Sequence, residues 1–274
     1  MSDVLIVFSY PFAIRALTVG LLISLCAALL GVSLVLKRFS MLGDGLSHVA
    51  FGAAAIALAI GAAPLKIAIP VVVIAAFLLL RVGSRVRGDA AIAMVSSSAL
   101  AVGIIVATFT TGMNTDINNY MFGSVLAVSR EDMWVAIPVS AAVLGMYLLF
   151  FNKMFSCTFD ESFSMAAGVR VKLYNSLLAV MTAVTVVIGM RIMGALLISS
   201  IITFPALSSM RICKSCRAVV ACAGVVSCVC FLIGIVLSFV YDMPAGASVV
   251  VANLGIFLFF SIISTLRSHH CKAL

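Results

Sequence analysis

Long apolar runs, separated by short polar or charged segments, are the dominant pattern of this chain of 274 residues. An α-helix needs about 20 mostly apolar residues to cross a bilayer, and each run is close to that length. The pattern therefore predicts an all-α polytopic membrane protein, a bundle of about eight or nine transmembrane helices. Single spans are expected over residues 16–36, 46–63, 65–82, 91–111, 133–151, 218–240 and 247–265.

One further run, residues 174–210, is apolar except for Arg191 and is too long for a single span. As one helix it would extend about 55 Å, against a hydrocarbon core of about 30 Å. We expect it to fold back near residues 189–191 and to supply two spans, which brings the total to nine. The second run of the chain is short and rich in glycine, so a broken or re-entrant helix is an alternative there.

Composition supports the membrane class. Hydrophobic residues make up 64% of the chain and charged residues only 9%, whereas a soluble domain carries about 25% charged residues. A soluble enzyme, a nucleic-acid binder and a disordered chain are excluded. The net charge of +8 therefore points to cytoplasmic loops, where Lys and Arg concentrate, and not to nucleic acid.

The basic residues also predict an orientation. With nine spans, all five basic clusters fall on one side of the membrane, which is expected to be the cytoplasmic side. The C-terminus then lies inside and the N-terminus outside. The clusters are Lys37/Arg38, Arg81/Arg85/Arg87, Lys153/Arg170/Lys172, Arg211/Lys214/Arg217 and Arg267/Lys272.

Ionisable residues are scarce in the predicted spans, and one pair stands out. Asp44 and His48 are four residues apart, so they share one face of a helix, and Gly52 continues that face and is expected to leave space before the imidazole. A carboxylate and an imidazole suit Zn²⁺, Mn²⁺ or Fe²⁺. The spacing equally fits a structural contact between the two side chains, with Asp44 helping to cap the helix.

The longest polar segment is residues 152–173. It contains a helix-like stretch from Asp160 to Ala167, which ends at Gly168. The segment is either a solvated connector or a docking helix for a soluble partner. The sequence has no G-x-x-x-x-G-K-[ST] motif, so it carries no P-loop of its own for ATP.

The cysteines give weaker signals. Cys213 and Cys216 form a C-x-x-C in a basic segment, which we interpret as a structural thiol pair because it lacks a second pair. The donor-rich tail His269-His270-Cys271 is interpreted as incidental.

Five collinear stretches carry a resemblance to a known family. The chain resembles the membrane permease of bacterial zinc, manganese and iron ABC importers, the ABC-3 family of ZnuB/MntB type. The stretches are 37–48 (KRFSMLGDGLSH), 120–129 (YMFGSVLAVS), 159–169 (FDESFSMAAGV), 193–206 (MGALLISSIITFPA) and 242–246 (DMPAG).

The resemblance implies an assembly and a set of functional residues. Two permease copies would line one path in the bacterial cytoplasmic (inner) membrane, with two cytoplasmic ABC ATPases and a periplasmic metal-binding protein as partners. Zn²⁺, Mn²⁺ or Fe²⁺ would be cargo, and no cofactor would be bound permanently. Asp44 and His48 match the family's Gly-Asp-x-x-x-His motif and would line the path. Coupling to the ATPase is assigned to Phe159, Asp160, Glu161, Ala166 and Gly168, and helix packing along the path to Gly43, Gly52, Gly194 and Pro205.

The expected function is therefore the permease subunit of a divalent-metal ABC importer, not itself an enzyme. The whole chain, 1–274, would be one permease domain with a coupling segment over about 153–173. Zinc-type members often carry a His early in the fourth span, where this chain has Ser96-Ser97-Ser98, so the metal is left open. The alternatives are a secondary, ion-coupled metal carrier, which would usually need carboxylates deep in its spans, and an intramembrane enzyme.

Overall fold

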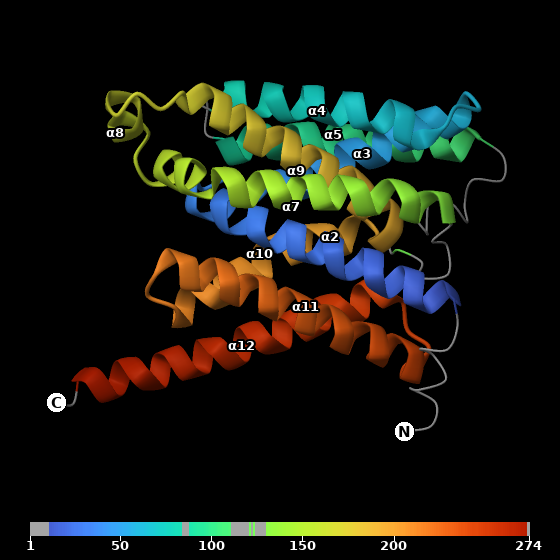
Figure 1. Ribbon diagram of the computed structural model, residues 1–274. Helices are drawn as coiled ribbons and strands as arrows, with labels where there is room; N and C mark the ends of the chain where they lie inside the picture. The colour runs from blue at the N-terminus through green and yellow to red at the C-terminus, as the bar shows by residue number, and fades with distance from the viewer. Residues whose placement is uncertain (1–10, 84–87, 111–120, 122, 124–129, 273–274) are drawn as a thin grey trace.

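The structure, a computed structural model, describes residues 11–83, 88–110, 121, 123 and 130–272. These residues fold into helices that lie side by side along a common direction, with α12 crossing obliquely beneath α11 (Figure 1). The helices are α2 (Pro11–Leu36), α3 (Leu42–Ala59), α4 (Pro64–Gly83), α5 (Gly88–Phe109), α7 (Arg130–Phe159), α8 (Glu161–Ala166), α9 (Val171–Met193), α10 (Ala195–Ile212), α11 (Cys216–Tyr241) and α12 (Ala245–Lys272).

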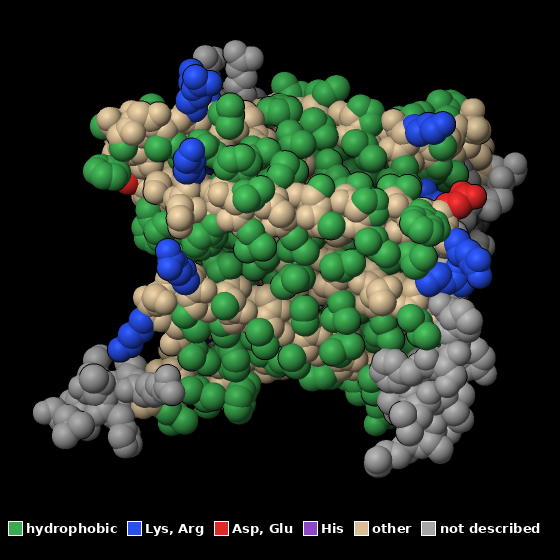
Figure 2. Space-filling model, viewed as in Figure 1, with side chains coloured by type: hydrophobic (Ala, Val, Ile, Leu, Met, Phe, Trp, Pro, Cys, Tyr) green, Lys and Arg blue, Asp and Glu red, His purple; other side chains and the backbone are tan. Residues whose placement is uncertain are grey.

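The helix lengths confirm the predicted membrane bundle. Within the described residues, eight helices are long and apolar enough to span a bilayer, and the first part of α4, Pro64–Leu80, adds a shorter apolar stretch. Together they correspond to the nine predicted runs. Figure 2 shows apolar side chains around the middle of the molecule and charged side chains at its two ends, as a chain embedded in hydrocarbon requires.

Three helices form the centre of the bundle. About 72% of the apolar window of each of α2, α3 and α9 is buried within the chain, compared with 22% in α5 and α7 and 11% in α12. Helix α2 packs against α7, α9, α10 and α11, whereas α3 packs against α4, α5, α9 and α10. The peripheral helices therefore leave wide apolar faces for lipid or for another chain.

The turn between α9 and α10 lies at Gly194, three residues after the predicted position. Gly194 has φ +90° and ψ 157°, a conformation that essentially only glycine adopts. The expectation of a break at 189–191 was wrong because Gly189 is packed inside α9. A Cβ at Gly189 would overlap the side chain of Ile198, so this glycine allows α9 and α10 to approach closely.

Helix α3 is continuous from Leu42 to Ala59, so the alternative of a broken second span is not observed. It follows a five-residue turn after α2, in which Arg38 adopts φ +62°. Gly43 lies against the side chain of Ile202, and Gly45 against Ile92. The first turn of α3 therefore rests on the middle of α10 on one side and on α5 on another.

Successive helices alternate in direction, which brings the described basic clusters to one end of the bundle. We call this the basic end; the C-terminus lies there, and α2 begins at the opposite end (Figure 1). Arg85 and Arg87 fall outside the described residues. At the opposite end, Arg191 of α9 forms an ion pair with the nearly buried Asp132 of α7, with 2.9 Å between Nη2 and Oδ1.

Close packing of α2 on α10 predicts a stability effect at Gly31. A Cβ there would overlap the carbonyl oxygen of Ile202, and backbone cannot move aside as a flexible side chain can. We expect Gly31→Val to lower the free energy of unfolding by about 1–3 kcal/mol or more, measured as thermal unfolding in detergent. Gly145→Val in α7 is the control, because its Cβ would meet nothing within 4 Å; equal loss in both variants would contradict the packing argument.

Candidate functional site

Asp44 and His48 lie one turn apart at the start of α3 and face each other. The Asp44 Oδ1 and His48 Nε2 atoms are 3.6 Å apart, which is longer than a hydrogen bond. Both side chains are partly exposed, Asp44 by 39% and His48 by 22%. Since Gly43 rests on the middle of α10, the pair lies part-way across the bundle and not at its basic end.

The start of α3 does not use Asp44 as its N-cap. The N-cap residue is Met41, whose side chain makes no capping hydrogen bond. The Ser47 hydroxyl donates to the Asp44 carbonyl oxygen at 2.7 Å, while the Asp44 carboxylate is directed at the imidazole. The two side chains are thus in contact, but at 3.6 Å Asp44 Oδ1 and His48 Nε2 are too far apart for a hydrogen bond.

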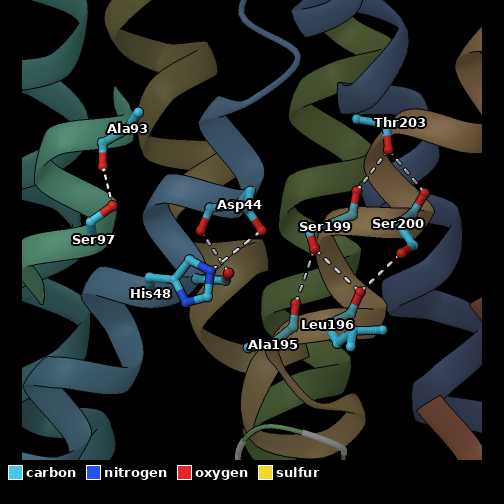
Figure 3. Close-up of polar contacts among 10 residues, drawn as sticks. Asp44, His48, Ala93, Ser97, Ala195, Leu196, Ser199, Ser200 and Thr203 are labelled. Atoms are coloured by element: carbon cyan, nitrogen blue, oxygen red, sulfur yellow. Dashed lines mark hydrogen bonds and ion pairs between the residues drawn. The ribbon is translucent and has the colours of Figure 1, made fainter. Parts of the chain in front are cut away.

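Hydroxyl groups of α10 form the other wall of the site. Figure 3 shows Asp44 between His48 on one side and Ser199, Ser200 and Thr203 on the other. Ser200 donates to the Leu196 carbonyl at 3.0 Å and Thr203 to the Ser199 carbonyl at 3.0 Å. Ser200 and Thr203 donate their protons within α10, so their oxygen lone pairs remain available to a cation or to water. The Ser199 hydroxyl also lies within reach of the Asp44 carboxylate.

The second ring nitrogen of His48, Nδ1, is also without a hydrogen bond among the described residues. It is buried, and a buried polar atom rarely lacks a partner. Two ligands about 2.1 Å from a tetrahedral ion lie about 3.4 Å apart, close to the 3.6 Å between Oδ1 and Nε2. The distance between Oδ1 and Nε2 is therefore compatible with both atoms contacting one divalent cation.

The site offers few protein ligands. Within the part of the chain that the structure describes, no three His, Cys, Asp or Glu side chains form a group that could hold a metal. A structural zinc site is normally closed by four protein ligands. Two ligands with neighbouring hydroxyls and water suit a cation that binds briefly and leaves.

The four predicted packing residues have different surroundings. Gly43 contacts Ile202, and the position of a Cβ at Gly52 is occupied by the Ala99 carbonyl of α5. The space that we expected Gly52 to leave before the imidazole is therefore filled by α5 backbone. Gly194 forms the α9–α10 turn, and Pro205 is buried within a helix that continues through it.

Helix α8 projects at the basic end and has the predicted limits. Asp160 is its N-cap, and Asp160 Oδ1 accepts a hydrogen bond from the Phe163 amide at 2.9 Å. Gly168 ends the turn with φ +80°, which favours glycine. Large apolar side chains are exposed on this short segment, namely Phe159, Phe163 and Met165 at 63%, 69% and 59%.

Glu161, the first residue of α8, is turned toward its own chain. Its Oε1 accepts hydrogen bonds from Lys37 Nζ at 3.0 Å and from Asn175 Nδ2 at 2.9 Å. Partial burial would raise the pKa of Glu161, but the hydrogen bonds from Asn175 and Lys37 outweigh it and hold the pKa below its ordinary value. The carboxylate is therefore charged at neutral pH and is bound to the membrane part of the chain.

The thiols of the basic end are not joined. Cys213 and Cys216 are free and partly exposed, at the end of α10 and the start of α11. The interpretation of a structural thiol pair stays a prediction. The side chains of the tail His269-His270-Cys271 lie outside the described residues.

Several site residues were missed by sequence reasoning. Ser199, Ser200 and Thr203 are polar residues in an otherwise apolar run, with Thr203 three and four residues after the two serines. This helical spacing could have shown that they share one face of the helix. Nothing in the sequence indicates that Lys37 and Asn175 contact Glu161, because this contact depends on the tertiary fold. Ser96 is buried in α5, and Ser97, on the other side of His48 from α10, donates to the Ala93 carbonyl at 2.8 Å (Figure 3).

Comparison with known proteins gives consistent matches over almost the whole chain. A family model described as the ABC 3 transport family matches residues 9–264. The manganese transport system membrane protein MntC of Halalkalibacterium halodurans is 29% identical over 258 residues, which cover 92% of this chain and 88% of that protein. The high-affinity zinc uptake system membrane protein ZnuB of Haemophilus influenzae is 28% identical, covering 89% of this chain and 94% of that protein. Among solved structures, PsaBC from Streptococcus pneumoniae in complex with Fab aligns with a TM-score of 0.85 at 26% identity, covering 94% of both chains.

Proposed function

The chain belongs to the ABC 3 transport family, and we propose that it passes Zn²⁺, Mn²⁺ or Fe²⁺ along a path lined by Asp44 and His48. It is a transmembrane permease subunit of an ABC importer for a divalent transition metal and is not itself an enzyme. One observation carries the path proposal: Asp44 Oδ1 and His48 Nε2 stand 3.6 Å apart without a proper hydrogen bond, facing the hydroxyls of α10.

The chemistry of the pair supports transit of the metal and not storage. A carboxylate and a neutral imidazole bind divalent transition metals well, and hydroxyl and water oxygens complete a mixed shell. With two strong ligands from one chain, the ion is held loosely enough to leave. A second copy of the chain would present the same pair across the path, so that the ion passes between two equivalent sites.

The assembly that we propose contains two copies of this chain, two cytoplasmic ABC ATPases and a periplasmic metal-binding protein. ATP hydrolysis would belong to the separate ATPase chain, since this sequence carries no P-loop motif. The exposed apolar residues on α8 support the docking of a soluble partner at the basic end. The weakly buried faces of α5, α7 and α12 leave room for both lipid and the second permease copy.

We place the chain in the bacterial cytoplasmic (inner) membrane as one permease domain, 1–274, with a coupling segment over about 153–173. The basic end faces the cytoplasm in this proposal, because Lys and Arg are retained on that side. The opposite end, where α9 turns into α10, receives the metal from the binding protein.

The orientation predicts the outcome of reporter fusions. A fluorescent protein fused after Lys272 is expected to be bright, and alkaline phosphatase at the same position is expected to be inactive, because both would lie in the cytoplasm. A matched fusion after Tyr241, at the end of α11, should show the reverse. Phosphatase activity from the fusion after Lys272 would contradict the orientation.

The proposed function is tested by uptake into vesicles that contain the chain with its ATPase and binding protein. We expect accumulation of radioactive Mn²⁺ or Zn²⁺ that requires ATP and stops when the ATPase is omitted, and competition between the metals identifies the cargo. Accumulation by the permease alone, driven by a proton or sodium gradient, would instead establish the secondary carrier.

A further inference from the structure

Three side chains from three elements form a closed hydrogen-bonded triangle at the basic end. Lys37, just after α2, donates from Nζ to Glu161 Oε1 at 3.0 Å and to Asn175 Oδ1 at 2.6 Å. Asn175, in the first turns of α9, donates from Nδ2 to the same Glu161 Oε1 at 2.9 Å. Each member thus contacts the other two, and α8 is tied to both α2 and α9.

The Lys37 ammonium depends on this triangle. Its side chain is only 8% exposed, whereas Glu161 is 53% exposed. A buried cation without partners is strongly unfavourable, and among the described residues that line the cavity beside Lys37 there is no charged acceptor. Apart from Asn175, the residues that line it with Lys37 are apolar: Leu34, Phe39, Leu42, Leu80, Leu178 and Ala179.

A short hydrogen-bonded turn joins Lys37 to the site on α3. The Lys37 amide donates to the Ser33 carbonyl at 3.1 Å, and the Phe39 amide to the Leu34 carbonyl at 2.9 Å. The Leu42 amide then donates to the Phe39 carbonyl at 3.0 Å. The turn is therefore firmly linked from the end of α2 to the first turn of α3, where Asp44 lies.

We propose that Lys37, Glu161 and Asn175 form a brace that transmits movement of α8 to the α2–α3 turn and so to Asp44 and His48. The inference rests on the proposed function, in which α8 is the element that the ATPase moves. It assigns Glu161 a role inside this chain, and it makes Lys37 and Asn175 positioning residues that touch neither metal nor ATPase.

The brace is tested in the full complex of permease, ATPase and binding protein, in vesicles. Lys37→Met and Glu161→Gln should each lower the metal transported per ATP hydrolysed by about five-fold or more. In Lys37→Met, ATPase binding and hydrolysis should stay within about two-fold of the unmodified complex. The double variant Lys37→Glu/Glu161→Lys should recover most of the loss, because the Asn175 amide can donate and accept in either arrangement. Lys214→Met, which removes an exposed lysine at the same end, is the matched control.

A second measurement does not depend on transport. Spin labels at Met41, in the α2–α3 turn, and at Lys214, between α10 and α11, lie at exposed positions. In a chain without native cysteines they report the position of the α2–α3 turn. ATP should shift the distance between the labels when the brace is intact and not when Lys37→Met is present. If the unmodified complex moved no metal, the proposed function would fail, and the label distance would still decide the brace.

Two results would overturn the brace. Variants that lower only the yield and thermal stability, with unchanged metal per ATP and an unchanged label shift, would reduce the triangle to a structural contact. Loss of ATPase binding in Glu161→Gln but not in Lys37→Met would show that Glu161 acts on the ATPase directly.

Discussion

Replacing either member of the α3 pair is expected to lower ATP-driven metal uptake by at least about ten-fold, with normal membrane insertion. Asp44→Asn removes the charge of one ligand, and His48→Ala removes the other. Substitution of groups that merely support a metal ligand already costs about 10- to 100-fold in affinity or activity. Both side chains are partly exposed and stand 3.6 Å apart. Replacing one of them therefore does not leave the other as a buried charge without a partner, and the fold should persist.

The measurement is uptake in vesicles, together with the amount of inserted protein and its thermal unfolding. Asp242→Asn is a suitable control, because it also removes one carboxylate but lies at the exposed C-cap of α11. Asp242 adopts φ +51°, a conformation that Asn tolerates. Uptake that survives both α3 substitutions, or misfolding of both variants, would favour a purely structural role for the pair.

The fold could be read from the sequence to a large extent. Each apolar run became a helix, because a backbone in hydrocarbon must satisfy its hydrogen bonds within the segment. Some boundaries were misplaced: α3 is Leu42–Ala59 against the expected 46–63, and α7 extends to Phe159 against the expected 151. The turn expected at 189–191 was misplaced because the long apolar run contains more than one glycine. Gly189 and Gly194 look alike in sequence, and only packing against Ile198 reveals that Gly189 is needed inside the helix.

The site was predictable only in part. Asp44 and His48 could be paired because their spacing fixes a shared helix face. The contribution of α10 could not be predicted, because the sequence around Ser199 and Thr203 does not show that these residues lie beside α3. The same limit applies to Gly52, whose missing side chain could not be assigned to the Ala99 carbonyl before the α3–α5 contact was known.

Changes in α8 are expected to separate ATP hydrolysis from transport. Ala166→Asp places a charge on an exposed segment beside Phe163 and Met165, where an apolar partner surface would have to accept it. Gly168→Leu forces a branched side chain into φ +80°, which disfavours the turn that ends α8. We expect each variant to insert normally, since α8 stands outside the bundle, but to lose metal transport by about ten-fold or more.

The two substitutions are expected to lower transport for different physical reasons, and further measurements can distinguish these reasons. Asn tolerates positive φ far better than Leu, so Gly168→Asn should lose less transport than Gly168→Leu if the turn conformation matters. Ala166→Asp should instead weaken binding of the ATPase to the permease, measured by co-purification, because it alters the contact surface itself. Normal ATPase binding and normal transport in both Ala166→Asp and Gly168→Leu would show that 159–169 is only a connector between α7 and α9.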